Sequence, residues 1–246
     1  MENSLYVGLS RQLVLDHAMT MVANNVSNAN TPGYRAQNPM FQEYIAKAGA
    51  SYKDQDPLSM VYDMGQYDTT TPGTIQLTGG TYDIALNGPG FMEVMTPSGQ
   101  VQYTRAGNFT VNASNELVTP SGFKVSGPGG NPISIPAGAK DVVVTKAGEI
   151  TADGNAVGRI SVVEFDNLQD LKPEGNGLYS ASVAGRPATE TEVTQGALEG
   201  SNVNAVQEMT RMIDILRTYQ STMRMMNNEH ERQMGAIQKL ARTTSA

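Results

Sequence analysis

The sequence predicts an α+β protein whose N- and C-terminal helices form a coiled-coil-like domain and whose centre is an antiparallel β-rich domain. Apolar residues recur at spacings of three and four at both ends, whereas they alternate with a period of two through the middle. The 246 residues include 25 Gly and 12 Pro but no Cys or Trp. Turns are therefore frequent, and disulfides and thiolate metal ligands are excluded.

Residues 1–30 are predicted to form the first helix. Several asparagines followed by Pro32-Gly33 end it between Asn25 and Ala29, because Asn favours caps and turns and Pro lacks the N–H that another turn needs. Apolar residues at three- and four-residue spacings give the helix one apolar face. The positions expected to contact other helices are Leu5, Leu15, Met19, Val22 and Val26.

Residues 31–74 fit neither period and are predicted to form an extended connector. Asn38-Pro39 is expected to open a short helix within it, with Phe41, Tyr44 and Ile45 on one side. A connector of this length is uncommon inside a compact domain. We therefore expect it to become ordered against something else.

Residues 75–195 are predicted to form the central β-rich domain, as an antiparallel sheet, sandwich or open barrel. Asn87-Gly88 and Asp153-Gly154 are typical of type I′ hairpin turns, which need positive φ at both central residues. The sequence Thr-Pro-Ser-Gly occurs at 96–99 and again at 119–122, each time between apolar runs, and indicates a repeated hairpin. The expected strands contain Ile75 and Leu77 and the runs 82–86, 91–95, 101–103, 109–111, 142–144 and 160–165.

Residues 196–246 are predicted to carry the C-terminal helix, with 201–246 paired with the first helix. Two neighbouring apolar stripes make its face wider than a two-stranded seam requires, so the helix should touch more than one partner. Its expected contact positions are Val206, Met209, Met212, Ile213, Leu216, Tyr219, Met223, Met226, Met234, Ile237 and Leu240.

Charge disfavours nucleic acid as a partner. The net charge is -7, and the middle of the chain, residues 61–200, holds 7 basic and 15 acidic residues. A protein that neutralises phosphates needs a basic face instead. No apolar run is long enough to cross a membrane, and the first residues lack the pattern of a secretory signal, so we expect neither membrane insertion nor a cleavable signal peptide.

The chain offers little chemistry for catalysis. His17 and His230 each lack a ligand partner one helical turn away, and no glycine-rich phosphate loop is present. The acidic pairs Asp63 with Asp68 and Glu164 with Asp166 are more typical of solvated edges than of a glycosidase or calcium site. We therefore predict no catalytic residues, no cofactor and no metal ligands.

The two helical ends pose a packing problem that the middle does not. Each end has an apolar face that it cannot bury alone, and pairing the two ends still leaves part of the longer helix uncovered. Contact with other copies would cover it, and unlike contact surfaces would produce an open helical filament rather than a closed dimer. Ends that are loose before assembly also suit passage through a narrow export channel, which is a hypothesis.

Three separated motifs occur in order along the chain: NNVSNANTPGY at 24–34, the region 83–127 with DIALNGPGF, YTRAGNF and ELVTPSGFKVSG, and QGALEGSNVN at 195–204. Together they resemble motifs of the family of flagellar basal-body rod and hook proteins. Ser27 stands where Ala is common in the family, which puts no function in doubt. The family motif positions are Asn24, Asn25, Asn28, Asn30, Thr31, Gly33, Gln195, Gly196, Leu198, Glu199, Ser201 and Asn202.

Within the family, the opening residues 1–12 and the single modest middle domain most resemble proximal rod subunits. Distal rod subunits are the alternative, and hook subunits fit less well because they usually carry larger central insertions. The resemblance implies a non-enzymatic axial subunit that polymerises through its terminal helices, transmits torque and is exported by the flagellar type III apparatus into the periplasm. Its partners would be other copies of itself and other rod proteins. A peptidoglycan-active enzyme is the alternative from a different class.

Overall fold

The computed structural model describes residues 2–46 and 58–243, and the described chain divides into two units. The helical unit comprises Met1–Ser27, Gln37–Tyr67 and Asn204–Ala246. The β unit comprises Asn28–Ala36 and Asp68–Val203. The fold is α+β, with a helix at each end and a β-rich region between them, as the two periodicities predicted.

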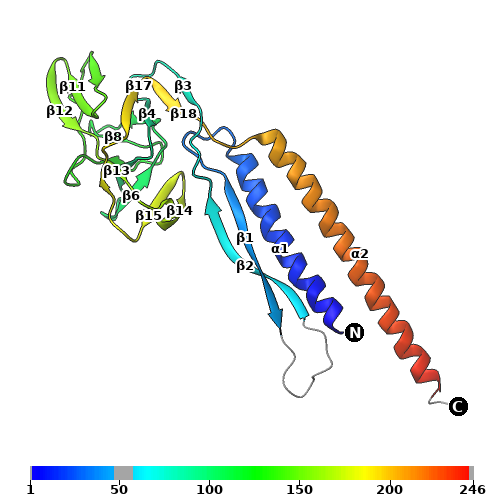
Figure 1. The fold of residues 1–246 in the computed structure, drawn as a ribbon. Coiled ribbons are helices and arrows are strands. Elements are labelled where there is room, and N and C mark those ends of the chain that lie inside the picture. Colours follow the sequence, from blue (N-terminus) through cyan, green and yellow to red (C-terminus); the bar gives the residue numbers. More distant parts are fainter. Residues whose placement is uncertain (1, 47–57, 244–246) are drawn as a thin grey trace. The chain divides into compact units, whose positions relative to one another are not determined.

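The helical unit contains two helices and a two-stranded ribbon (Figure 1). Helix α1 contacts both helix α2 and strand β1. The helices run antiparallel, because Gly8 faces Met226 at one end and Asn25 reaches Glu208 at the other. At about 1.5 Å per residue, α1 is ~39 Å long and α2 is ~58 Å. The elements are α1 (Glu2–Ser27), β1 (Gln37–Ala46), β2 (Leu58–Asp68) and α2 (Ala205–Thr243).

The helix boundaries follow from local capping. Helix α1 ends at Ser27, inside the predicted interval. Helix α2 begins at Ala205 because the Asn204 side chain accepts hydrogen bonds from the backbone N–H groups of Val206 (3.1 Å) and Gln207 (3.2 Å). Among the described residues, no helix is both long and apolar enough to cross a membrane.

The prediction of a short helix beginning at Asn38-Pro39 is wrong, because this segment forms strand β1. Phe41, Tyr44 and Ile45 belong to residue types that favour strands. An isolated helix of about ten residues is marginal in water. Strand β1 instead runs for ten residues and is hydrogen-bonded to β2. The strands run in opposite directions beside α1 (Figure 1).

The β unit is antiparallel in every strand pair that the structure describes, in agreement with the prediction. Its largest sheet has the order β14-β15-β6-β5-β9-β8-β7, with β13 pairing with both β5 and β16. Strands β10, β11 and β12 form a second sheet. Two further pairs, β17 with β4 and β18 with β3, join the last part of the unit to its first part.

The bounds of these elements agree with most of the predicted runs. The strands are β3 (Ile75–Leu77), β4 (Ile84–Asn87), β5 (Phe91–Met95), β6 (Val101–Thr104), β7 (Thr110–Val111), β8 (Leu117–Val118), β9 (Lys124–Val125), β10 (Val142–Val144), β11 (Glu149–Ala152), β12 (Asn155–Arg159), β13 (Val162–Glu164), β14 (Leu171–Gly175), β15 (Leu178–Ala181), β16 (Arg186–Pro187), β17 (Glu192–Gln195) and β18 (Ala197–Glu199), with a 3-10 turn at Leu168–Asp170. The main core is built from their buried aliphatic residues, Met92, Val94 and Val125 among them.

The repeated hairpin turn is confirmed. Thr96 N donates to Gln100 O (2.9 Å) between β5 and β6, and Thr119 N donates to Phe123 O (2.8 Å) between β8 and β9. Each Thr hydroxyl also accepts a bond from the N–H four residues later. The final glycines of the two copies have φ of 83° and 84°, a conformation that residues with a Cβ rarely adopt.

Of the two predicted type I′ turns, one is confirmed and one is wrong. Asp153 and Gly154 both have positive φ and connect β11 to β12. Asn87, however, ends β4, whose partner is the distant β17 rather than the next strand, and Gly88 has φ of 139°. A Cβ at Gly88 would lie 2.7 Å from the Cα of Thr191. Close approach of a distant segment therefore explains this glycine.

Candidate functional site

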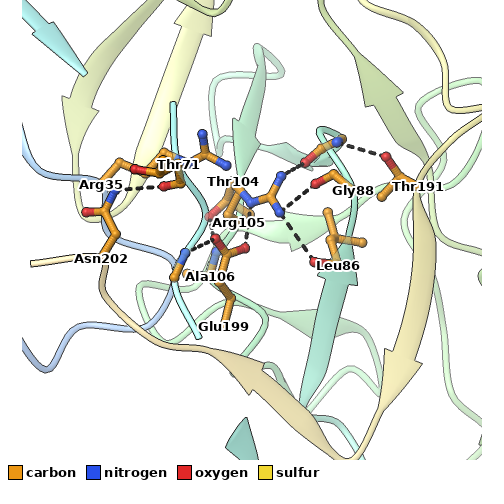
Figure 2. Close-up of polar contacts among 12 residues, drawn as sticks. Arg35, Thr71, Leu86, Gly88, Thr104, Arg105, Ala106, Thr191, Glu199 and Asn202 are labelled. Atoms are coloured by element: carbon orange, nitrogen blue, oxygen red, sulfur yellow. Dashed lines mark hydrogen bonds and ion pairs between the residues drawn. The ribbon is translucent and has the colours of Figure 1, made fainter. Parts of the chain in front are cut away.

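Family motif residues converge in the β unit on a buried ion pair (Figure 2). Arg105 Nε donates to Glu199 Oε2 at 2.6 Å, and both side chains are almost completely buried. The other Glu199 oxygen accepts from the backbone N–H of Gly73 at 3.1 Å. The remaining donors of Arg105 bond the carbonyl oxygens of Leu86 (3.3 Å), Gly88 (2.9 Å) and Gly90 (2.5 Å).

A second buried guanidinium, that of Arg35, lies close to this pair. The central guanidinium carbons of Arg35 and Arg105 lie 5.7 and 5.4 Å from the ring centre of Phe91, so the ring offers its electron-rich face to both cations. Arg35 Nη1 also donates to Thr70 O at 2.7 Å. Burial, followed by the nearby charge of Arg105, lowers the pKa of Arg35. The negative charge of Glu199 opposes this effect, and that of Asp68 does so to a smaller extent.

The same region ties together the segments that follow α1 and precede α2 in the sequence. Asn202 Oδ1 accepts from Ala36 N (2.7 Å), and Asn202 Nδ2 donates to Thr71 O (2.8 Å), as Figure 2 shows in part. Gly33 N donates to Glu199 O at 2.8 Å. A Cβ on Gly33, whose φ is 68°, would lie 2.5 Å from the carbonyl carbon of Arg105. Only glycine fits this position.

We call Gly33, Arg35, Arg105, Glu199 and Asn202 the motif junction. Glu199 accepts hydrogen bonds from Arg105 and Gly33, whereas Arg35 and Asn202 bond neighbouring backbone groups. Arg35 Nε is buried and has no hydrogen-bond partner among the described residues. Within the part of the chain that the structure describes, no cluster of His, Asp and Glu residues has the grouping of a metal site. The junction is suited to fixing the paths of two chain segments rather than to acid-base or nucleophilic chemistry.

Among the remaining motif residues, Gln195 and Ser201 hydrogen-bond to the backbone, whereas Thr31 and Asn28 bond each other. The Gln195 side-chain amide donates to Thr81 O (2.9 Å) and Val142 O (2.8 Å), and its oxygen accepts from Val144 N (3.0 Å). Thr31 Oγ1 donates to Asn28 Oδ1 at 3.1 Å in the turn after α1. Further motif positions in the β unit are Asn30, Gly196 with φ of 71°, Leu198 in β18, and Ser201, whose hydroxyl accepts from the N–H of Val203.

Asn25 performs the corresponding task in the helical unit. Its side chain exchanges two hydrogen bonds with the backbone of Gln37 at the start of β1, both 2.9 Å long. Its Nδ2 also donates to Glu208 Oε2 on α2 at 3.1 Å. One fully buried amide therefore links α1, β1 and α2. The neighbouring motif residue Asn24 is exposed on α1 and makes polar contacts of its own.

The predicted contact positions of the helices fall into three groups. On α1, Val22 is buried within the unit, while Leu5, Leu15, Met19 and Val26 are half-buried. On α2, Met212, Tyr219 and Met226 are half-buried, and Leu240 lies outside the described side chains. The exposed α2 residues, which we call the outer seam, are Val206, Met209, Ile213, Leu216, Met223, Met234 and Ile237.

The histidines and acidic pairs considered as catalytic or metal-binding candidates lie in ordinary structural contacts or at the surface. His17 Nδ1 lies 2.5 Å from Asp63 Oδ2 on β2, and His230 is exposed. Buried Glu164 accepts bonds from Thr189, Glu190 and Thr191, and Asp166 pairs with Arg186 at 3.3 Å. Burial acts to raise the pKa of Glu164, but these hydrogen bonds outweigh it and the pKa is lowered.

Three protein-family models match the regions that contain these motifs. The model described as "Flagella basal body rod protein" matches residues 5–35, "Flagellar hook protein FlgE/F/G D1 domain" matches 85–152, and "Flagellar basal body rod FlgEFG protein C-terminal" matches 194–238. The flagellar basal-body rod protein FlgF of Caulobacter vibrioides is 39% identical over 98% of this chain and 99% of its own length. The chain belongs to the flagellar basal-body rod protein family. This family consists of structural proteins of the flagellar basal body, not enzymes.

Other relatives fit the same assignment. FlgF of Mesorhizobium japonicum is 31% identical over 98% of both chains. The rod protein FlgG of Caulobacter vibrioides is 33% identical over 81% of this chain and 85% of its own length. The chain is thus more similar to the FlgF than to the FlgG of the same species.

Arg105 and Arg35 of the motif junction and an exposed ridge on α1 were not predicted from the sequence. Arg105 lies inside the quoted motif YTRAGNF, but its role required the position of Glu199, 94 residues later. Arg35 directly follows the first motif and carried no signal of burial. On α1, the exposed ridge consists of Tyr6, Leu9 and Leu13, a set with three- and four-residue spacing that the sequence pattern contained.

Proposed function

We propose that this chain is a structural axial subunit of the flagellar basal-body rod, in its proximal part, and that it assembles through its terminal helices. The greater similarity to FlgF than to FlgG of one species supports the proximal over the distal position. Family membership supports a location in the basal body and assembly with other rod proteins.

One observation carries the assembly mode: the outer seam stays exposed although α1 packs against α2. Val206, Met209, Ile213 and Leu216 continue a seven-residue repeat of the kind that packs between helices. Burying such side chains is worth roughly 25 cal/mol per Å² of apolar surface. A helix with two adjacent apolar faces needs a second helical neighbour, and another copy or a related rod subunit supplies it.

We propose that in the rod the helices of residues 1–30 and 201–246 form an inner coiled-coil layer, that residues 75–195 lie outside it, and that 31–74 connects the two. The charge distribution supports this layering. Residues 201–246 carry 6 basic and 4 acidic side chains, whereas 61–200 carry 7 and 15. Crowding around a shared axis costs least where charge is balanced, and an acidic surface tolerates solvent.

We further propose that the flagellar type III apparatus exports the chain into the periplasm without a cleavable signal peptide. Support comes from the family membership and from the exposed apolar helix faces, which suit a chain that completes its fold on assembly. Torque would then pass through many interlocked helices rather than through an active site.

The test is the substitution Ile213→Asp, which places a charge in the outer seam. The self-association of the purified chain, measured by sedimentation, should fall by at least tenfold, because burying an unpaired charge is costly. The matched control is Ser221→Asp, an exposed residue of the same helix outside the seam. If the Ile213→Asp chain assembles as the wild type does, and cells that carry it remain motile, the outer seam is not an assembly surface.

The same variant separates assembly from export. Cells with the export apparatus should secrete Ile213→Asp normally, and cells lacking the apparatus should retain both variant and wild type. A peptidoglycan-active enzyme remains the alternative from another class, and it requires two carboxylates flanking a cleft. Release of muropeptides by the purified chain would support that alternative.

A further inference from the structure

Exposed methionines are concentrated on helix α2. Met209, Met223 and Met234 belong to the outer seam and are 52%, 41% and 45% exposed. Met225 in α2, Met40 in β1 and Met64 in β2 are 53%, 44% and 51% exposed but lie outside the seam. In contrast, Met21 in α1 and Met92 in β5 are 2% and 0% exposed. The chain thus contains accessible and inaccessible thioethers that can be compared within one molecule.

We propose that the outer seam is a redox-sensitive assembly surface, in which oxidation of Met209, Met223 and Met234 to sulfoxides prevents association. The inference rests on the proposed function of the seam. Hydrogen peroxide transfers one oxygen atom to the thioether sulfur. The O–O bond breaks, the S–O bond forms, the sulfur is oxidised by two electrons, and the rest of the peroxide is released as water. Two thiols reverse the reaction by forming a disulfide and releasing the oxygen as water.

The physical consequence follows from where these sulfurs lie. A sulfoxide turns a flexible apolar group into a strongly polar hydrogen-bond acceptor. At a seam that must be dehydrated between helices, the sulfoxide oxygen of Met209 loses its water without gaining a donor from Val206, Ile213 or Leu216. Near Met223 and Met234 the same stripe of α2 carries exposed Gln220, Asn227 and His230, so we expect the Met209 sulfoxide to be the most disruptive. The unassembled chain is the vulnerable form, since packing against a neighbour covers the same sulfurs.

The experiment treats the purified full-length chain with hydrogen peroxide and maps oxidised peptides by the added mass of one oxygen. We expect Met209, Met223 and Met234 to oxidise well before Met21 and Met92. Self-association by sedimentation should fall about tenfold or more, and treatment with methionine sulfoxide reductases should restore it. Oxidised chains that associate as untreated chains do would overturn the proposal.

Two variants make the result specific, each compared with its own untreated sample. In the triple variant Met209→Leu, Met223→Leu, Met234→Leu, peroxide should change association by less than twofold. In the control Met225→Leu, the loss should equal that of the wild type. A triple variant that stays fully sensitive would overturn the proposal, because another oxidation would then be responsible.

A footprint distinguishes this failure from failure of the proposed function. The seam methionines should be protected at least tenfold when peroxide is added after assembly. If they react equally before and after assembly, the outer seam is not the contact surface, and the assembly mode itself is refuted. If they are protected but their sulfoxides are harmless, only the redox inference falls.

Discussion

Removing one partner of the buried Arg105–Glu199 pair should destabilise the β unit severely. The substitution Arg105→Met keeps much of the side-chain length but removes four hydrogen bonds and leaves Glu199 without its direct counter-charge. Breaking a buried pair in this way costs about 3–5 kcal/mol. For a unit of this size, ~1 kcal/mol shifts the melting temperature by about 2–4 °C. We therefore expect a drop of about 10 °C.

The assay is thermal unfolding followed by far-ultraviolet circular dichroism, with a double-mutant cycle through Glu199→Leu. Because each single variant leaves an unpaired buried charge, the double variant should be less destabilised than the sum of the singles by at least ~1 kcal/mol. The control is Lys146→Met, which breaks the exposed pair with Glu192 and should cost at most about 1 kcal/mol. Additive effects, or a cost for Arg105→Met no larger than the control's, would refute the reasoning.

Two further predictions test the backbone and the pH response. A Cβ at Gly107 would lie 1.6 Å from Ile84 O, so Gly107→Ala should lower the melting temperature, whereas Gly235→Ala, in an open position of α2, should raise helix stability by up to ~1 kcal/mol; equal shifts would contradict the geometry. The lowered pKa of Glu164 means that the unfolded chain binds the proton more readily, so its contribution is complete above the ordinary pKa of 4.5 and is lost as the pH falls through the folded value. Glu164→Gln should flatten the acid limb of an unfolding titration, and an unchanged slope would exclude this carboxylate as the cause.

Local signals in the sequence were sufficient wherever the structure is local. The end of α1 and the two Thr-Pro-Ser-Gly turns depend on contacts within five residues, and both predictions are confirmed. The same turn geometry recurs at Thr145, whose N–H bonds Glu149 O and whose hydroxyl accepts from Glu149 N, ending in Gly148 with φ of 82°. A search for Thr-x-x-Gly alone would have found this third copy.

The errors arise where distant segments compete with a local preference. Asn87-Gly88 has the composition of a hairpin, but β17 pairs with β4 and leaves no local partner to turn toward. The segment beginning at Asn38 has a plausible helix start, but a strand partner twenty residues later gives it a ribbon. Likewise, the role of Arg105 depends on Glu199, and no sequence window contains both.

The wide apolar stripe of α2 shows the same division between what local pattern determines and what assembly determines. Periodicity identifies its residues, but a helix cannot reveal by itself which half of a wide stripe an internal partner covers. Here the side that includes Met212, Tyr219 and Met226 is half-buried, with Met226 against Gly8 of α1, and the side that includes Ile213 and Leu216 stays open. The α1 ridge of Tyr6, Leu9 and Leu13 is open as well. Two unlike open surfaces on one unit are what head-to-tail contact between copies requires, and such contact builds an open filament when its rotation does not close into a ring. That filament is the geometry proposed above for the rod.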